Sequence, residues 1–195
     1  MREKLIFIGG GGHCKSVLDV ALDAGYEVVG ILDKPERVGD NVLGIPIIGT
    51  DDDIPALAET ALFVITVGQL PDCSLRRRIS LKVESVGGRF ATLIARDAHV
   101  SSFASVGEGS VVLHKAVINA DAEVGRHSII NTMANIEHDA KVGDFCHVST
   151  GAMVNGGTRL GDGCFVGSGA VLFQYIRIAD GSVIPAGSVI KQSFG

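Results

Sequence analysis

A branched aliphatic residue recurs every six positions through the second half of the chain, and this period limits what the chain can fold into. The residue four places after each aliphatic is Ala, Ser, Thr or Cys in fourteen of sixteen repeats, the exceptions being Ile176 and Phe194. A six-residue period fits neither a helical face nor a hairpin meander, but it fits short strands separated by corners. The sixteen aliphatics, with no slip in phase, are Val100, Val106, Val112, Ile118, Val124, Ile130, Ile136, Val142, Val148, Val154, Leu160, Val166, Leu172, Ile178, Ile184 and Ile190.

Each six-residue repeat is expected to form one side of a coil, and three repeats close one triangular coil. Residues eighteen apart therefore stack on successive coils at the parallel-strand spacing of roughly 4.8 Å. The aliphatic and the small residue are both expected to point inward. Cys146 and Cys164 are eighteen apart at the small position, which predicts two reduced core thiols. A tight or left-handed backbone is expected at the glycines directly after an aliphatic, such as Gly107, Gly125, Gly143, Gly161 and Gly167. Because the repeat is a scaffold, function must lie on residues that depart from it.

The first ninety-odd residues follow a different pattern, typical of a small Rossmann-like α/β domain. Apolar runs predict strands at 4–8, 28–33 and 62–67 and a short fourth strand at 90–94, with helices starting after the glycine turn at 9–12 and spanning about 50–61 and 71–86. The segment 35–49 is rich in proline and glycine and is predicted to form turns. We therefore predict a Rossmann-like domain over 1–95 and a β-helix domain over 96–195.

Ligands of such α/β sheets bind beyond the carboxyl ends of the strands, here at 9–13, Asp33 and Gly68. The dinucleotide fingerprint G-x-G-x-x-G is not met, because Cys14 or Lys15 takes the third glycine position, so NAD is not predicted. A glycine turn followed by Asp33 is compatible with a nucleotide or nucleotide sugar, with backbone amides for phosphate and a carboxylate for hydroxyl or imide hydrogens. A turn that is merely tight is the alternative.

Charge and composition argue against several kinds of partner. The formal net charge is −5 and the only basic cluster is the short run 76–78, so nucleic acid is not expected. No apolar stretch has the length of a membrane span, and the N-terminus lacks the features of a signal peptide, so we expect a cytoplasmic protein. The four cysteines form no C-x-x-C pair and the six histidines suggest no closed zinc site, so no metal is expected.

His138 stands between two carboxylates, Glu137 and Asp139, within one repeat. Neighbours along a strand point to opposite faces, so His138 and Asp139 can meet only at a corner, which this repeat supplies every six residues. A carboxylate bound to the imidazole fixes its tautomer and raises its basicity, as a general base requires. The alternatives are an exposed histidine on a polar coil, or a different chemistry with Cys14 or Cys146 as nucleophile.

Together these features resemble the hexapeptide-repeat acyltransferases, and more closely the NeuD/PglD branch of sugar acetyltransferases. The resemblance covers essentially the whole chain, and its most specific part is the pair His138 and His147, nine residues apart. The similar stretches are 6–13, 31–33, 67–68, 130–132, 136–139 and 142–149.

The resemblance implies a left-handed parallel β-helix that assembles as a homotrimer with active sites between subunits, and acetyl-CoA as co-substrate. It implies that His138 is the general base and that Asp139 supports it. The implied acetyl-CoA contacts are His147, Gly167, Ser168 and Ala186. The implied contacts of the nucleotide sugar are Gly11, Gly12, His13, Asp33, Lys34 and Gly68.

The expected reaction is direct N-acetylation of a nucleotide-linked 4-amino-4,6-dideoxy sugar. The nucleotide is expected to be UDP. O-acetylation of a sialic-acid-like sugar is an alternative, as is a nucleotide-sugar-binding module or a trimeric scaffold without catalysis. The chain departs from the family pattern at Lys34 and Gln69, where some relatives have an acidic residue and Asn, which bears on base and sugar specificity. The usual C-terminal extension has no counterpart after 191–195, from which weaker coenzyme A binding is expected.

Overall fold

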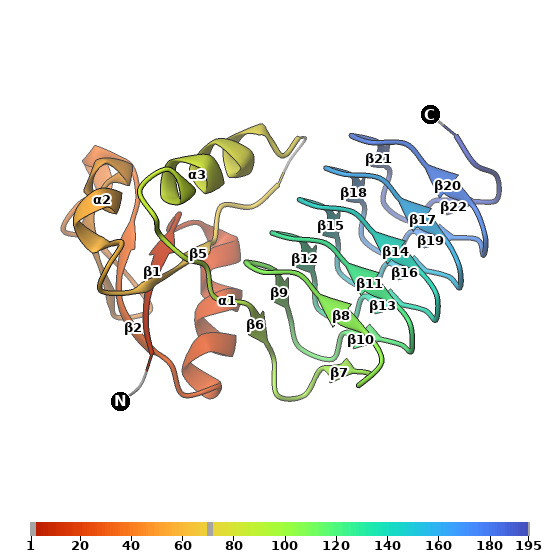
Figure 1. Cartoon of the computed structure of the whole chain (residues 1–195), viewed down its shortest axis with the longest axis horizontal. Coiled ribbons are helices and arrows are strands. Elements are labelled where there is room, and N and C mark those ends of the chain that lie inside the picture. Colours follow the sequence, from red (N-terminus) through yellow and green to blue (C-terminus); the bar gives the residue numbers. More distant parts are fainter. Residues whose placement is uncertain (1–2, 70–71, 195) are drawn as a thin grey trace. The chain divides into compact units, whose positions relative to one another are not determined.

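The structure is a computed structural model that describes residues 3–69 and 72–194 of the 195-residue chain. It divides into two compact units, one made of Met1–Gly68 and Ser74–Leu93 and the other of Gln69–Cys73 and Ile94–Gly195. The first unit is an α/β sheet and the second a parallel β-helix (Figure 1), which confirms the predicted fold class. Among the described residues, no helix combines the length and apolar character that a membrane crossing needs.

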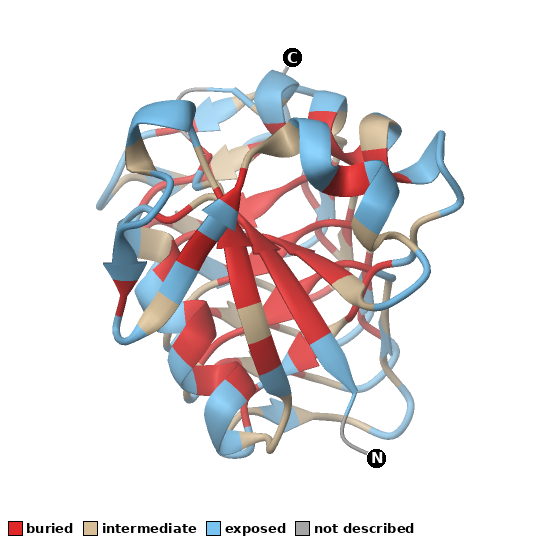
Figure 2. Ribbon diagram, turned by 90° about the vertical axis from the view of Figure 1, so that its left-hand side faces the viewer, coloured by how far each residue is buried: buried red, intermediate tan, exposed pale blue. Residues whose placement is uncertain are grey.

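The α/β unit is built on a five-stranded sheet in the order β3-β4-β2-β1-β5, in which only β3 and β4 pair antiparallel. Its interior strand β1, which lies between β2 and β5, has four consecutive buried residues (Figure 2), as expected for a parallel strand covered on both faces. The elements of this unit are β1 (Lys4–Ile8), α1 (Gly12–Asp23), β2 (Glu27–Leu32), η1 (Pro35–Arg37), β3 (Asn41–Val42), β4 (Ile45–Gly49), η2 (Asp51–Asp53), α2 (Ile54–Leu57), β5 (Leu62–Ile65) and α3 (Ser74–Glu84), followed by β6 (Leu93–Ile94).

One local prediction for this unit is wrong, and two predicted elements are shorter than expected. The segment 35–49 contains the strands β3 and β4, and Ile47 of β4 pairs in parallel with Ile31 of β2. Its prolines and glycines signal turns, but the isoleucines between them are enough to extend the sheet. The helix expected over 50–61 is only the short η2 and α2, and the strand expected over 90–94 is reduced to β6 and one bridge between Phe63 and Phe90.

The β-helix consists of sixteen two-residue strands, and each ends on an aliphatic of the repeat, as predicted. They form three parallel sheets in which paired residues are eighteen apart, for example Val117 with Asn135. The strands are β7 (His99–Val100), β8 (Ser105–Val106), β9 (Val111–Val112), β10 (Val117–Ile118), β11 (Glu123–Val124), β12 (Ile129–Ile130), β13 (Asn135–Ile136), β14 (Lys141–Val142), β15 (His147–Val148), β16 (Met153–Val154), β17 (Arg159–Leu160), β18 (Phe165–Val166), β19 (Val171–Leu172), β20 (Arg177–Ile178), β21 (Val183–Ile184) and β22 (Val189–Ile190).

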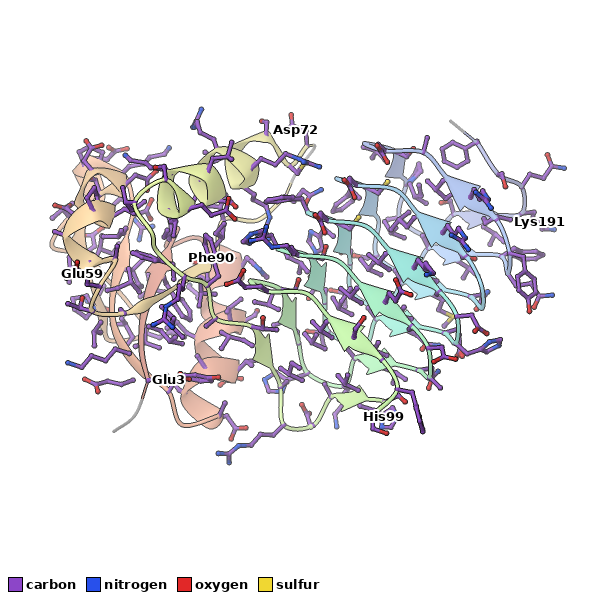
Figure 3. The ribbon with its side chains drawn as sticks, viewed as in Figure 1. Glu3, Glu59, Asp72, Phe90, His99 and Lys191 are labelled. Carbon is purple, nitrogen blue, oxygen red and sulfur yellow. The ribbon has the colours of Figure 1, made fainter. Side chains whose placement is uncertain are left out.

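Successive strands of the β-helix belong to different sheets. We name them the first sheet, containing β7, β10, β13, β16, β19 and β22, the second sheet, containing β8, β11, β14, β17 and β20, and the third sheet, containing β9, β12, β15, β18 and β21 together with the preceding β6. Side chains project inward and outward from every coil (Figure 3). The inward aliphatics and small residues, including Cys146 and Cys164, form one continuous core, as predicted.

The corners of the coils do not use glycine in the predicted way. The residue with a left-handed backbone is the third after the aliphatic, for example Gly151 at φ 64° or Asp139 at φ 60°. The glycines directly after an aliphatic have no positive φ, so the left-handed reading of those positions is wrong. Glycine is required at these positions because the backbone of the next coil leaves no room for a side chain. A Cβ at Gly125, for example, would lie 2.6 Å from the carbonyl carbon of Gly143.

Candidate functional site

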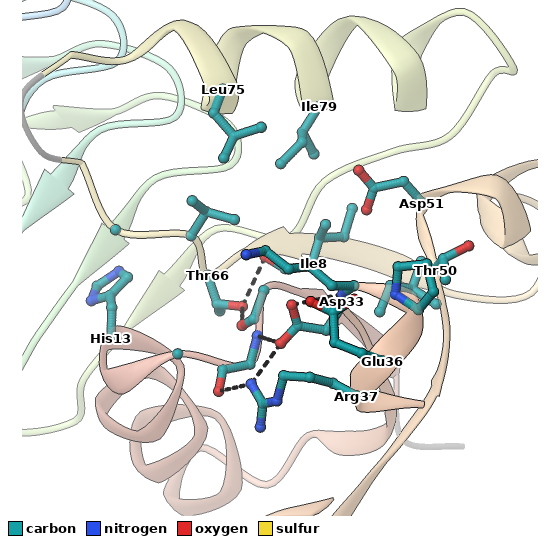
Figure 4. A pocket seen from close by; sticks show the side chains of 18 of the residues that line it. Ile8, His13, Asp33, Glu36, Arg37, Thr50, Asp51, Thr66, Leu75 and Ile79 are labelled. Atoms are coloured by element: carbon teal, nitrogen blue, oxygen red, sulfur yellow. Dashed lines mark hydrogen bonds and ion pairs between the residues drawn. The ribbon is translucent and has the colours of Figure 1, made fainter. Parts of the chain in front are cut away.

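The α/β unit has a cavity of about 850 Å³ at the carboxyl ends of β1, β2 and β5 (Figure 4). Two segments far apart in sequence meet there, because a Cβ added at Gly68 would lie 3.9 Å from Cβ of His13. All six residues predicted to bind the nucleotide sugar line this cavity, namely Gly11, Gly12, His13, Asp33, Lys34 and Gly68.

The glycine turn leads into the N-terminus of α1, which no side chain caps. Gly11 is the N-cap residue, its successor Gly12 is the first residue of the helix, and the first turn contains no acidic residue. A Cβ at either glycine would meet no atom within 4 Å, so the space beside the turn is open. A helix N-terminus presents backbone N–H groups and a partial positive charge, and this one therefore suits a phosphate group.

Asp33 is fixed at the floor of the same cavity. Its Oδ2 accepts hydrogen bonds from the backbone N–H of Gly10 at 2.9 Å and from Nη1 of Arg37 at 2.7 Å, and its Oδ1 accepts one from the backbone N–H of Lys34 at 2.8 Å (Figure 4). A carboxylate has about four lone-pair sites, so Asp33 keeps capacity for a ligand hydrogen.

Two cationic residues of this cavity, Arg37 and Arg78, were not predicted. Arg37 follows Asp33 by four residues in a segment that the sequence suggested was only turns. Arg78 belongs to the basic run 76–78, whose members have different roles. Arg76 is buried and donates to the backbone carbonyl of Val67 at 2.7 Å, so it supports the strand ends.

A second cavity, of about 390 Å³, lies on the β-helix where the first sheet turns into the second. His138 lies in this corner, between β13 and β14. The left-handed backbone of Asp139 turns its carboxylate toward the imidazole, and Nδ1 of His138 lies 2.7 Å from Oδ2 of Asp139. The predicted meeting of these two residues at a corner is confirmed. The residues lining the cavity are Glu137, His138, Asn155, Gly156, Phe173 and Gln174.

The imidazole of His138 is more than half exposed, and its Nε2 is available to a ligand. The hydrogen bond that Nδ1–H of His138 donates to Asp139, together with the charges of Asp139 and Glu137, raises the pKa of His138 above its ordinary value of 6.5. The next coil leaves room for the ring, since a Cβ at Gly156 would lie 2.8 Å from both Nε2 and Cε1 of His138. The neutral ring, with its Nδ1 proton held by Asp139, is a base whose Nε2 faces the cavity.

His147 lies elsewhere on the same chain. It is on β15 of the third sheet, and its Nε2 lies 3.0 Å from Nδ2 of Asn131. Gly167, Ser168 and Ala186 are in the corners that follow strands of this same third sheet. The four residues predicted to contact acetyl-CoA therefore share one face and its edge, and none of them lines the His138 cavity.

The cysteines are poorly suited to act as nucleophiles. Burial raises the pKa of the Cys14 thiol to about 11. The neighbouring thiol of Cys164, together with burial, raises the pKa of Cys146 well above its usual value. Both groups are thus protonated at neutral pH, and only a thiolate attacks readily. Within residues 3–69 and 72–194, no three His, Cys, Asp or Glu side chains are grouped so that they could hold a metal ion.

Comparison with known families agrees with the description of both units, the α/β unit and the β-helix. Residues 4–83 match the family described as PglD N-terminal domain, and residues 139–174 match the bacterial transferase hexapeptide family over six repeats. Among curated proteins, an uncharacterized protein of Acanthamoeba polyphaga mimivirus is 35% identical over 102 residues, which are 52% of this chain and 19% of that protein.

Two solved structures resemble nearly the whole chain. A histidine variant of perosamine N-acetyltransferase from Caulobacter crescentus, in complex with CoA and GDP-perosamine, is 31% identical with a TM-score of 0.92, covering 98% of this chain and 90% of that one. The acetyltransferase domain of PglB from Neisseria gonorrhoeae FA1090, in complex with acetyl coenzyme A, is 34% identical with a TM-score of 0.91. The match covers 100% of this chain and 93% of that one.

Proposed function

Since the chain belongs to the NeuD/PglD family of hexapeptide-repeat sugar acetyltransferases, we propose that it transfers an acetyl group from acetyl-CoA to the amino group of a nucleotide-linked sugar. The observation that carries this proposal is the His138–Asp139 pair, whose free Nε2 faces a cavity on the β-helix. Family membership supplies the reaction class, and this pair supplies the base that the reaction needs.

The acceptor is proposed to bind in the cavity of the α/β unit. The backbone N–H groups at the start of α1 would hold the diphosphate, and Asp33 would accept hydrogens from the nucleoside. His13, Lys34 and Gly68 would complete the wall around the ligand. A UDP-linked 4-amino-4,6-dideoxy sugar is the first candidate, and GDP-linked sugars come next because the Caulobacter relative was solved with GDP-perosamine.

The chemistry requires no covalent acyl-enzyme, because the thioester carbonyl is already activated. The sugar amine attacks the carbonyl carbon while Nε2 of His138 removes one amine proton. We propose that the backbone N–H of Gly156, a residue in the wall of the same cavity, stabilises the oxyanion of the tetrahedral intermediate. Collapse breaks the carbon–sulfur bond, and His138 returns the proton to the leaving thiolate, giving the acetamido sugar and free CoA.

Acetyl-CoA is proposed to lie along the third sheet, against His147, Gly167, Ser168 and Ala186. A corner between two faces of a triangular coil is opposite the third face, so one chain cannot present His138 and His147 to the same substrate. We therefore propose a homotrimer in which each site takes His138 from one chain and His147 from its neighbour. A cytoplasmic location is proposed as well, in keeping with four free cysteines.

A complementation experiment tests the shared site. Trimers of His138→Ala and of His147→Ala are each expected to be inactive, whereas unfolding, mixing and refolding them together should restore activity. With equal amounts of both chains, about a quarter of the sites would combine an intact His138 with an intact His147. Mixed trimers as inactive as either parent would contradict the proposal, with refolded wild type as the control.

The proposed function is tested by measuring thiol release from acetyl-CoA with amino sugars linked to UDP, dTDP or GDP. Free sialic acid in the same screen tests O-acetylation. A binding module without catalysis would release no thiol and would gain no thermal stability from acetyl-CoA, whereas a ligand at a hundred times its Kd adds about 2.7 kcal/mol. Absence of both thiol release and stabilisation would reject the proposal.

The pH dependence of kcat/KM should report His138. A base works only when it is deprotonated, so activity is expected to fall as pH drops through the pKa of His138, which is raised above 6.5 chiefly by Asp139. In the variant Asp139→Asn this support is lost, so the acid limb should move to lower pH while the maximal rate falls. An acid limb at the same pH in both proteins would show that Asp139 does not act on the base.

A further inference from the structure

Glu137 lies beside His138 in the cavity wall, and two amides hold its carboxylate. Its Oε1 accepts a hydrogen bond from Nδ2 of Asn135 at 2.8 Å, and its Oε2 accepts one from Nδ2 of Asn119, one coil earlier, at 2.9 Å. The residue is half-buried, and both of its oxygens have a fixed position. The carboxylate is therefore rigid at the place where an acceptor must approach the base.

Within the described part of the chain, no lysine or arginine neutralises the negative charge of this carboxylate, and the charged group that acts on it is the neighbouring His138. Two other glutamates that bridge coils are ion-paired, Glu123 with Lys141 at 2.6 Å and Glu108 with Arg126 at 3.1 Å. Among the described residues, no lysine or arginine pairs with Glu137. The hydrogen bond from Asn135, followed by that from Asn119, lowers the pKa of Glu137, so the group remains charged at neutral pH.

The network around Glu137 is not one that stability alone would favour. Oδ1 of Asn135 is buried and has no hydrogen-bond partner among the described residues. An unsatisfied buried oxygen costs free energy, as does a partly buried charge without a counter-ion. The same two amides that fix the carboxylate thus leave an energetic penalty, which points to a use for the charge in the bound state.

The remaining hydrogen-bonding capacity of Glu137 matches an amine. A carboxylate has about four lone-pair sites, of which the asparagines use two and the backbone N–H of His138 uses a third. Aliphatic amines are largely protonated at neutral pH, so an amino sugar arrives as an ammonium ion with three N–H donors and a positive charge. A hydroxyl at the same carbon has one donor and no charge, and it gains less from the carboxylate.

We propose that Glu137 is a specificity-determining residue that binds the ammonium group of the acceptor sugar beside His138 and so favours amines over hydroxyls. This inference rests on the proposed acetyl transfer and narrows its acceptor to a primary amine. The ammonium gives up one proton to solvent before attack, and His138 removes the second proton during transfer and returns it to the leaving thiolate. Glu137 orients the nitrogen and does not itself take a proton.

The test compares Glu137→Gln with Glu123→Gln, a control whose carboxylate also bridges two coils but lies outside the cavity. For each protein, KM is measured for the amino-sugar nucleotide that the wild type acetylates best. The inhibition constant is measured for the same compound with a hydroxyl in place of the amine. Loss of a charged hydrogen bond predicts that Glu137→Gln raises KM for the amine roughly ten- to hundredfold, with the hydroxyl compound and acetyl-CoA unaffected.

Each outcome of this test has a distinct reading. Equal losses for the amine and the hydroxyl compound, or a KM like that of wild type, overturn the inference. Should Glu137→Gln unfold, Glu137→Asp keeps the charge, and it is expected to retain the preference for the amine; loss of that preference also overturns the inference. A wild-type protein that acetylates no amino-sugar nucleotide refutes the proposed function instead, which the preceding screen detects independently of Glu137.

Discussion

Replacing His138 with alanine is expected to lower kcat for acetyl transfer by about 10²- to 10⁴-fold, the range that a positioned general base contributes. The imidazole is largely exposed and packs in no core, so the protein should fold as before. KM for the nucleotide sugar should change little, because we propose that the sugar nucleotide binds mainly in the cavity of the α/β unit. Steady-state measurement of thiol release gives both constants.

The matched control is His99→Ala, because His99 is also an exposed histidine at a strand of the β-helix (Figure 3) but lies outside the cavity. This variant should have wild-type turnover. If His138→Ala also turns over like wild type, the general base has been misassigned. A loss shared by both variants would instead indicate damage to the coils.

Replacing Gly12 with aspartate should separate stability from binding. A Cβ at Gly12 meets no other atom, and an acidic side chain at a helix N-terminus stabilises the helix by about 0.3–1 kcal/mol. The same carboxylate would occupy the phosphate position and repel a nucleotide diphosphate. We expect a melting temperature equal to or above that of wild type, together with nucleotide-sugar affinity lowered by at least about a hundredfold, since like-charge juxtaposition costs several kcal/mol.

Calorimetric titration with the nucleotide sugar, alongside thermal unfolding, measures the two effects. Gly12→Ala is the control, since it fills the same space without charge, and its affinity should fall far less. Equal losses in the two variants would mean that steric exclusion explains the effect. An unchanged affinity in Gly12→Asp would place the phosphates away from α1.

The sequence was most informative where a residue has one structural role. Each aliphatic of the array marks the end of a strand because the interior of a coil accepts little else, so all sixteen strands could be predicted. Segment 35–49 was harder to interpret, because Pro46 and its neighbouring glycines resemble turn signals while Ile47 adds a strand through pairing with a distant partner. Such pairing depends on tertiary contacts that local propensity does not encode.

The same distinction applies to the sites. The glycine turn and Asp33 follow strand ends, whose carboxyl edge is a known place for ligands, and they were predictable. Gly156 was not, because its importance comes from stacking eighteen residues after His138 rather than from any motif. His138 and His147 are close in sequence, yet they lie on opposite sides of one chain because three sheets separate successive hexapeptides.

Most corners of the β-helix have a left-handed residue at the third position after the aliphatic, so the backbone that brings Asp139 to His138 recurs along the stack of coils. One coil before His138 and Asp139, the equivalent residues are Ala120 and Asp121, and Asp121 has the same left-handed backbone at φ 59°. A histidine at position 120 would find a carboxylate already turned toward it, roughly 4.8 Å along the axis. Successive coils thus offer equivalent corners one strand spacing apart, and the sequence determines which of these corners carries the proposed base.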